Sequence, residues 1–373
     1  MPHLNEHCEK AIAHTEQQHL RRRLRTSAHV AGAMVDIVQD GVRLVSFADN
    51  DYLGLRADPR VIAAGQQALA EYGAGAGASR LVTGNHPLYA PLEQQLAAMK
   101  GAQAALVFGS GYLTNLGVIP ALMGKGDVIF ADKLVHACIL DAAQLSGARL
   151  IRFAHNDMPH LETLLKEHRE ESPRALIVTD HVFSMDGDVA PLASIAALAE
   201  RYDAWTMADD AHGLGIVPAA APMDIWMGTL SKAAGGYGGY VVGSQALIDF
   251  LVTTARSLVF STGLPPALCA SAQVALEIIA AEPERGQRAL QLAQRVTEVL
   301  GLPLARSAIV PVMLGTPERA LAASEALRQQ GLLAVAIRPP TVPPGTARLR
   351  LAFSCAHTDA QVEKLIAVLK EVL

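Results

Sequence analysis

Short continuous apolar runs alternate with longer amphipathic segments along residues 103–243. A short apolar run bounded by turn residues is typical of a strand buried on both faces, and the amphipathic segments are typical of helices. The predicted strands are 103–108, 127–131, 149–153, 175–179, 204–208, 223–227 and 240–243, and the predicted helices are 112–123, 136–145, 158–170 and 191–202. This alternation predicts βαβ units and an α/β fold with a mostly parallel sheet that carries helices on both faces.

The two ends of the chain have a different pattern. An amphipathic helix is expected over about residues 5–25, ending in an arginine cluster that is either a solvated face or an anion site. A strand at 43–47 and a helix from Pro59 follow. Beyond Pro266 the predicted helices are 267–281, 287–300, 317–330 and 359–372, and the predicted strands are 308–314, 335–337 and 348–353. We therefore expect an N-terminal arm (1–45), a large domain (46–275) and a smaller α+β domain (276–373).

Composition narrows the class of protein. The chain of 373 residues is 51% hydrophobic and has a formal net charge of −5, so no overall basic field favours nucleic acid as a partner. Glycine and proline interrupt the two long uncharged runs, 102–124 and 257–276, so we expect no membrane span. The four scattered cysteines contain no Cys-x-x-Cys pair, which argues against a disulfide framework or a metal site and favours the reducing cytoplasm.

Candidate chemistry centres on Lys232, which lies in the nearly uncharged, glycine-rich segment 228–240 after a predicted strand. A lysine kept away from water is partly deprotonated, and it can then act as a nucleophile and form a Schiff base. The alternative is that Lys232 extends from a glycine-rich turn into solvent. The residues at the ends of the neighbouring predicted strands distinguish between the two interpretations.

Other predicted strands also end in polar residues. Segment 109–111 opens a helix, where unpaired N–H groups favour an anion such as phosphate, although Ser110 can equally be an ordinary N-cap. Asp209 and Asp210 follow another strand, and only one of two adjacent strand carboxylates can face a site. An inward carboxylate there can hold a cationic ring nitrogen. His212 can orient that carboxylate or bind a ring oxygen.

His136 and Ser184 complete the set of candidates. An imidazole at the start of a helix can stack on a flat ring and transfer protons, and Ser184 can hydrogen-bond the same ring. Each residue alone is more often structural. Neither a Gly-x-Ser-x-Gly nor a His-Glu-x-x-His motif is present, which argues against a serine hydrolase or a zinc protease. A nucleophilic lysine, an inward aspartate, a stacking histidine and an anion-binding helix start are the parts that pyridoxal phosphate requires.

Five segments, taken together, identify a family. They are 50–55 (NDYLGL), 183–188 (FSMDGD), 209–213 (DDAHG), 228–233 (GTLSKA) and 260–266 (FSTGLPP). Nearly end to end, the chain resembles the α-oxoamine synthases, which are fold-type I pyridoxal-phosphate enzymes. This resemblance implies a seven-stranded large domain, a smaller C-terminal domain and a homodimer with shared active sites. It also implies the condensation of an amino acid with an acyl thioester and the release of carbon dioxide.

The resemblance also implies roles for individual residues. Lys232 would form the Schiff base, Asp209 would pair with the pyridine nitrogen, and His212 would contact the ring oxygen. His136 would stack over the ring and take part in catalysis with these three, and Ser184 would contact the ring from the side. The implied phosphate-site residues are Gly111, Tyr112 and Thr229, with Ser261 and Thr262 contributed by the partner subunit.

Arginines suggest the substrates. Arg350 matches the arginine that holds the amino-acid carboxylate. Segment 336–343 (AIRPPTVP) adds Arg338 to a Thr-Val-Pro stretch, which includes Thr341 and which other members carry without the arginine. A bidentate cation suits a distal carboxylate, and Arg21 matches a further substrate-binding arginine. The resemblance therefore implies L-alanine and a pimeloyl thioester of coenzyme A or an acyl carrier protein as the substrates, in biotin biosynthesis.

Three departures keep alternatives open. The chain between His212 and Met223 is shorter than in the family, and Tyr89 replaces a common histidine. Segment 235–239 (GGYGG) resembles members that join glycine to acetyl-CoA. Such a synthase is the first alternative, followed by an aminotransferase and by a non-catalytic partner subunit, against which the presence of Lys232 argues.

Overall fold

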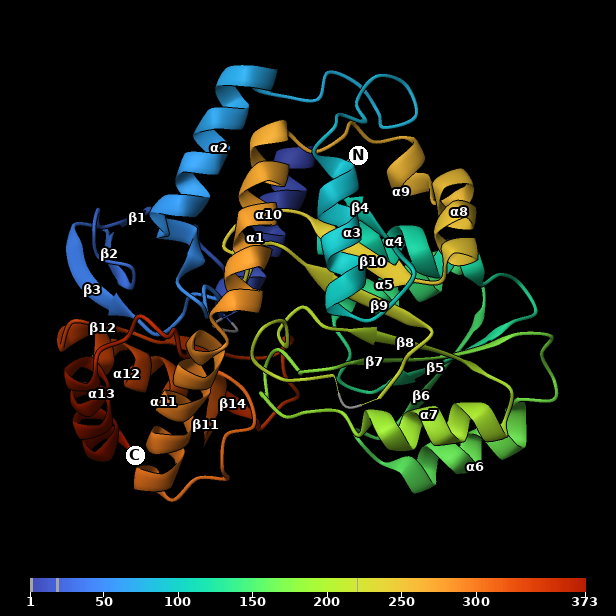
Figure 1. Ribbon diagram of the computed structural model, residues 1–373. Coiled ribbons are helices and arrows are strands. Elements are labelled where there is room, and N and C mark those ends of the chain that lie inside the picture. The colour runs from blue at the N-terminus through green and yellow to red at the C-terminus, as the bar shows by residue number, and fades with distance from the viewer. Residues whose placement is uncertain (1–2, 18–19, 220) are drawn as a thin grey trace.

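The computed structural model describes residues 3–17, 20–219 and 221–373. Its largest sheet has seven strands in the order β4-β10-β9-β8-β7-β5-β6, of which only β10 runs antiparallel to its neighbours (Figure 1). The strands are β4 (Ala104–Phe108), β5 (Val128–Asp132), β6 (Arg149–Phe153), β7 (Ala175–Asp180), β8 (Trp205–Asp209), β9 (Ile225–Thr229) and β10 (Gly239–Gly243). The predicted α/β fold with a mostly parallel sheet is confirmed.

Helices cover both faces of this sheet because consecutive strand side chains point to opposite faces. Leu106 belongs to one buried cluster, and its neighbour Val107 belongs to the other. The first cluster lies under α4 (Gly111–Leu122), α5 (Ala137–Ser146), α8 (Gln245–Thr254) and α9 (Arg256–Val259). The second lies under α3 (Tyr89–Met99), α6 (Met158–His168), α7 (Leu192–Arg201) and α10 (Pro266–Ala281), which also packs against α2 (Pro59–Tyr72).

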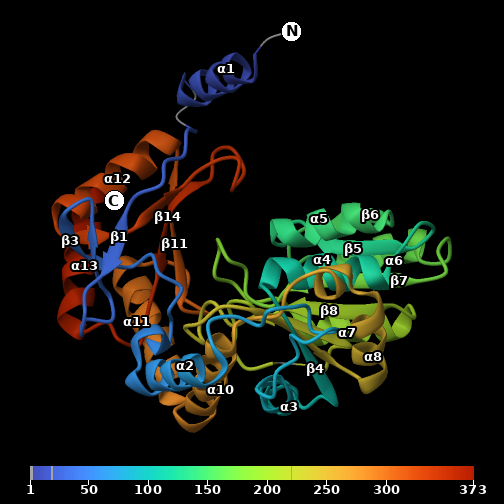
Figure 2. The same cartoon turned by 90° about the horizontal axis from the view of Figure 1, so that it is seen from above.

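The C-terminal part is built on a three-stranded antiparallel sheet in the order β11-β14-β13. Its strands are β11 (Ile309–Gly315), β13 (Val335–Ile337) and β14 (Ala347–Ala352), and its helices are α11 (Glu284–Leu300), α12 (Pro317–Gln329) and α13 (Asp359–Val372). The N-terminal strands β1 (Ser27–His29), β2 (Asp36–Gln39) and β3 (Val42–Ser46) join this part, because β3 pairs with β12 (Leu332–Leu333). Helix α1 (Leu4–Gln17) projects away from the body (Figure 2).

The predicted N-terminal helix was too long. Helix α1 ends at Gln17, positions 18–19 of the predicted helix lie outside the described residues, and residues 20–26, which contain the arginine cluster, have no regular secondary structure. A run of like charges gives a helix no favourable pairs between residues four apart, which removes support for continuing it. Helices α3, α8 and α9 and strands β1, β2 and β12 were not predicted. The prolines at 87 and 91 hid the helical spacing of Tyr89, Leu92 and Leu96, which are all buried.

No helix among the described residues is both long enough and apolar enough to cross a membrane. All four cysteines are free thiols, and Cys138 and Cys269 are buried. The short 3₁₀ turn Leu55–Ala57 leads from the N-terminal strands into α2, whose N-cap is Asp58.

Candidate active site

A cavity of about 330 Å³ opens at the carboxyl ends of β7, β8 and β9. Lys232, which follows β9, lines it together with His136, Asp209 and His212. The Lys232 Nζ atom lies 2.8 Å from His212 Nε2. Burial lowers the pKa of Lys232, and the opposing charges of Asp209 and Asp180 only partly offset this effect. The structure therefore favours the sheltered lysine over the solvent-exposed alternative.

His212 is held from its other side by Tyr52. The Tyr52 hydroxyl lies 2.6 Å from His212 Nδ1 and 3.0 Å from Asn50 Oδ1, and Arg350 Nη2 donates to both that hydroxyl and Asn50. Burial lowers the pKa of His212 well below its usual range, with further lowering by the charges of Lys232 and Arg350. The neutral imidazole of His212 thus connects Lys232 to Tyr52, and the Tyr52 hydroxyl in turn contacts Arg350.

The two adjacent aspartates point in opposite directions. Asp209 faces the cavity, where it accepts hydrogen bonds from Asn115 Nδ2 and from the backbone N–H of Ala211, each at 3.0 Å. Asp210 is completely buried on the other side, 2.5 Å from Lys100 Nζ and 2.6 Å from His181 Nδ1. This agrees with the expectation that only one of the two carboxylates faces the site.

His136 caps the start of α5. Its Nδ1 accepts from the backbone N–H of Cys138 at 3.3 Å, and its own backbone N–H donates to Asp180 Oδ1 at 3.2 Å. Burial lowers the pKa of His136, against the raising effect of the Asp209 charge. The residue therefore has the structural role of an N-cap and also presents an imidazole to the cavity.

The first turn of α4 forms another wall of the cavity. Ser110 is the N-cap, and its Oγ accepts from Leu113 N at 3.2 Å, so the ordinary capping role is present. The first N–H groups of a helix have no partners within the helix and attract anions. A Cβ atom added to Gly111 would lie 3.3 Å from Thr229 Cβ, so a side chain there would crowd this wall.

Some predicted residues lie outside this cavity. Arg21, Arg338 and Thr341 line a separate cavity of about 840 Å³ between residues 20–25 and the α12–β13 region. Thr262 forms an isolated bridge with Ser79. Ser261 and Thr262 line a small hollow beside β4, and the backbone carbonyl of Ser184 accepts from Arg350 Nε at 2.5 Å. None of these residues is among those that line the cavity around Lys232 within one chain.

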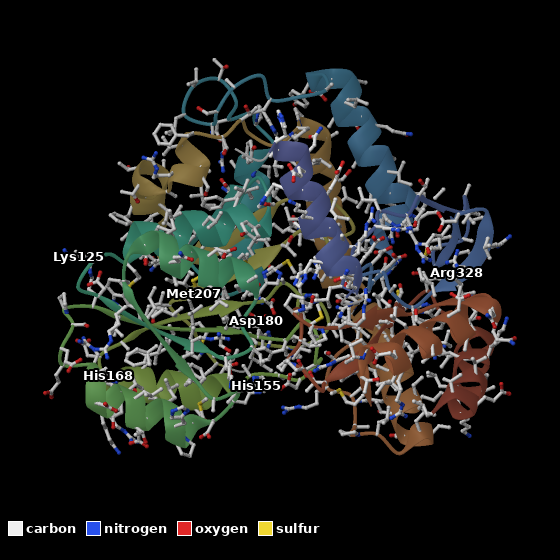
Figure 3. The ribbon with its side chains drawn as sticks, turned by 180° about the vertical axis from the view of Figure 1, so that it is seen from behind. Lys125, His155, His168, Asp180, Met207 and Arg328 are labelled. Atoms are coloured by element: carbon white, nitrogen blue, oxygen red, sulfur yellow. The ribbon has the colours of Figure 1, made fainter. Side chains whose placement is uncertain are left out.

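Several site residues were not singled out from the sequence. Tyr52 belongs to a segment that was recognised, but its contact with His212 depends on the fold. Asp180 ends β7 beside Asp209 and is labelled in Figure 3. It directly follows the predicted strand 175–179, so its position at a strand end could have identified it as a candidate. Asn115 and Cys138, which contact each other, lie inside helices and gave no comparable signal.

Comparisons with known proteins agree over nearly the whole chain. The model of the aminotransferase class I and II family matches residues 42–369. An 8-amino-7-oxononanoate synthase from Methylorubrum extorquens (strain PA1) is 58% identical over 97% of this chain and 94% of its own length. That from Methylobacterium nodulans (strain LMG 21967 / CNCM I-2342 / ORS 2060) is 56% identical over 100% and 97%. A serine palmitoyltransferase from S. paucimobilis, solved with PLP bound, has a TM-score of 0.92 at 30% identity and covers 98% of this chain and 96% of its own.

Proposed function

The chain belongs to the 8-amino-7-oxononanoate synthases of the aminotransferase class I and II family, and on this premise we propose that it condenses L-alanine with a pimeloyl thioester. The products are 8-amino-7-oxononanoate, carbon dioxide and the free thiol carrier. The main support for this proposal is that one cavity is lined by Lys232, Asp209, His212 and His136 together. The relative from Methylorubrum extorquens (strain PA1), which is similar over nearly the full length of this chain, is an 8-amino-7-oxononanoate synthase.

Pyridoxal phosphate is the cofactor, and the residues present fit it. The cavity offers an amine, a buried carboxylate, an imidazole and a helix N-terminus, which match the aldehyde, ring nitrogen, ring face and phosphate of this molecule. When bound, the cofactor supplies an electron sink that makes the α-carbon of an amino acid acidic. We assign Lys232 to the aldehyde, Asp209 to the ring nitrogen and His212 to the ring oxygen. Gly111, Tyr112 and Thr229 are assigned to the phosphate.

Lys232 supplies both the nucleophile and the base in this proposal. Burial lowers the pKa of its ammonium group, so a larger fraction of Nζ is the free amine near neutral pH. His212 Nε2, at 2.8 Å, holds Nζ in place. Because both groups are shifted toward their neutral forms, Lys232 Nζ is suited to take the proton from the α-carbon of alanine and to return it to the product.

Arg350 is proposed to bind the carboxylate of alanine. Its guanidinium is buried in the link between Tyr52 and the 183–188 segment, donating from Nη2 to Tyr52 and from Nε to the Ser184 carbonyl. These contacts fix the plane of the guanidinium, which is needed for bidentate binding of a carboxylate. Ser184 itself is proposed to contact the ring from the side.

Arg21, Arg338 and Thr341 are proposed to bind the acyl substrate. They line one cavity, in which the arginine side chains give a positive field suited to the distal carboxylate of a pimeloyl chain. We further propose a cytoplasmic homodimer in which Ser261 and Thr262 complete the phosphate site of the other subunit. All four cysteines are free thiols, as suits a reducing compartment.

The experiment is thiol release by the purified enzyme across a small panel. Alanine or glycine is combined with pimeloyl thioester, its uncharged analogue or acetyl thioester. We expect alanine with pimeloyl thioester to be the fastest pair. The glycine-rich segment 235–239 favours a second candidate, a synthase for glycine and acetyl-CoA. Release only from glycine with acetyl thioester would replace the first proposal by the second.

A further inference from the structure

A chain of hydrogen bonds along the cavity wall connects Asp209 to His136. Asn115 Nδ2 donates to Asp209 Oδ2 and to Cys138 Sγ, each at 3.0 Å. Cys138 Sγ in turn lies 2.9 Å from His136 Nδ1. The chain thus runs from the carboxylate assigned to the ring nitrogen, through an amide and a thiol, to the imidazole assigned to the ring face.

The direction of each hydrogen bond follows from the donors available. The amide nitrogen of Asn115 has only hydrogens to offer, so the sulfur of Cys138 is the acceptor in that contact. The thiol then keeps its own hydrogen for His136 Nδ1. The backbone N–H of Cys138 also points to that nitrogen, at 3.3 Å. Two donors converge on His136 Nδ1, so this nitrogen carries no hydrogen in the neutral ring.

The thiol itself is protected from reaction. Burial raises the pKa of Cys138 to about 12, and the Asp209 charge adds to the rise, so the sulfur stays protonated at neutral pH. A protonated thiol can donate continuously to His136, whereas a thiolate would attract a proton onto the ring.

We propose that Cys138, oriented by Asn115, is a positioning residue that holds His136 as the neutral imidazole with its hydrogen on Nε2. This inference rests on the proposed function, because it concerns the residue assigned to the ring face. In this state His136 offers the cavity a flat ring and an Nε2–H donor, and its Nδ1 is not available to accept a proton. Proton transfer at the α-carbon therefore falls to Lys232.

Charged groups around His136 act on the equilibrium between its neutral and protonated imidazole. Asp209 on β8 and Asp141 on α5 favour the protonated imidazole, while Lys232 and burial oppose it. Asp180 on β7 accepts from the backbone N–H of His136. The contribution of Cys138 is separable from these charges, because replacing the sulfur leaves all of them in place.

The test is nitrogen NMR of the histidine-labelled holoenzyme without substrates, comparing wild type with Cys138→Ala and Cys138→Ser. A serine hydroxyl is also a donor and should preserve the wild-type signals. Loss of the donor in Cys138→Ala should raise the pKa of His136 by about half a unit to one unit. Cys269→Ala is the matched control, because Cys269 is a buried cysteine of α10 outside this chain of hydrogen bonds.

The proposal predicts a protonated Nε2 in wild type, an upward shift in Cys138→Ala, and no shift in Cys138→Ser or Cys269→Ala. A hydrogen on Nδ1 in the wild-type enzyme would overturn it. So would a Cys138→Ala titration that matches the Cys269→Ala control. Because no substrate is present, either result leaves the proposed condensation to be judged separately by the thiol-release panel.

Discussion

At the residue scale, the site depends on which of two adjacent or similar groups faces the cavity. Asp209 and Asp210 have the same chemistry, but strand geometry sends the first to the cavity and the second to Lys100. Lys232 and Lys100 are likewise both sheltered lysines. Lys100 Nζ lies 2.5 Å from the buried carboxylate of Asp210, whereas the hydrogen-bonding partner of Lys232 Nζ is the neutral imidazole of His212.

Labelling of the lysine tests this contrast. Borohydride reduction of the yellow holoenzyme should fix a phosphopyridoxyl group to the peptide that contains Lys232, as measured by peptide mass spectrometry. Lys232→Ala should lose this label and lose at least about 10³-fold in turnover, because nucleophile and base disappear together. Labelling of Lys100 instead of Lys232 would refute the assignment.

Arg338 allows a prediction about the acyl substrate. Arg338→Ala should raise KM for pimeloyl thioester by about 10- to 100-fold, because a charge-assisted hydrogen bond is lost. KM for the uncharged analogue should change little. Arg43→Ala, which removes an exposed arginine paired with Asp36, is the control. Equal effects on both thioesters would show that Arg338 does not bind the distal carboxylate.

At the element scale, the sequence predicted the repeating strands and helices because continuous burial on both sheet faces leaves an unmistakable apolar pattern. Strand β6 and helix α13 have the predicted bounds or nearly so. Helix α3 was missed because Pro87 before it and Pro91 in its first turn resemble turn signals, and β1 was missed because its three residues are all exposed. The contact between Asn115 and Cys138 could not be predicted, since it depends on the packing of α4 against α5.

The buried ion pair between Lys100 and Asp210 is a test of element packing. Lys100→Met should lower the free energy of unfolding by about 3–5 kcal/mol, because Asp210 would remain buried without its cation. Urea unfolding followed by tryptophan fluorescence suits this variant, since Lys100 Nζ lies 4.4 Å from the Trp226 ring centroid. Lys10→Met, which breaks an exposed pair with Glu6, should change stability by less than about 1 kcal/mol. An equally small effect for Lys100→Met would contradict the account.

His155, in the loop after β6, contacts Asp132 at the end of β5 at 3.0 Å and Asp188 of the 183–188 segment at 2.7 Å. Burial opposes the charged form, but hydrogen bonds to these two carboxylates prevail and raise the pKa of His155 to about 10. A raised pKa stabilises the fold fully below pH 6.5, and this stabilisation is lost as the pH rises toward 10.

Wild-type stability should therefore fall between pH 7 and 10 by up to a few kcal/mol. His155→Gln should be less stable at pH 7 and should show a smaller decline, measured by urea unfolding at each pH. An identical pH dependence in the two proteins would exclude His155 as the source. The 183–188 segment also carries the Ser184 carbonyl that accepts a hydrogen bond from Arg350, so the variant should raise KM for alanine.

At the scale of the whole molecule, the single chain contains the cavity around Lys232 but keeps Ser261 and Thr262 elsewhere. Sequence resemblance placed these two residues in the site of a partner subunit, and the fold of one chain leaves that proposal to be tested. Helix α1, which projects from the body in Figure 2, has no buried residue.

Subunit mixing tests the shared site. Lys232→Ala and Thr262→Glu should each be nearly inactive, the second because a carboxylate would repel the phosphate. After equal amounts are unfolded and refolded together, mixed dimers should contain one intact site, so activity should return to about one quarter of wild type. If each subunit uses its own Thr262, the mixture should remain as inactive as its components.

The proposed condensation is tested most directly by the stoichiometry of the products from alanine labelled with carbon-13 at the carboxyl group. With pimeloyl thioester, we expect equal amounts of free thiol, labelled carbon dioxide and 8-amino-7-oxononanoate, and all three should be abolished in Lys232→Ala. Pyruvate that retains the label, accompanied by conversion of the cofactor to its amine form and no thiol, would show an aminotransferase and contradict the account.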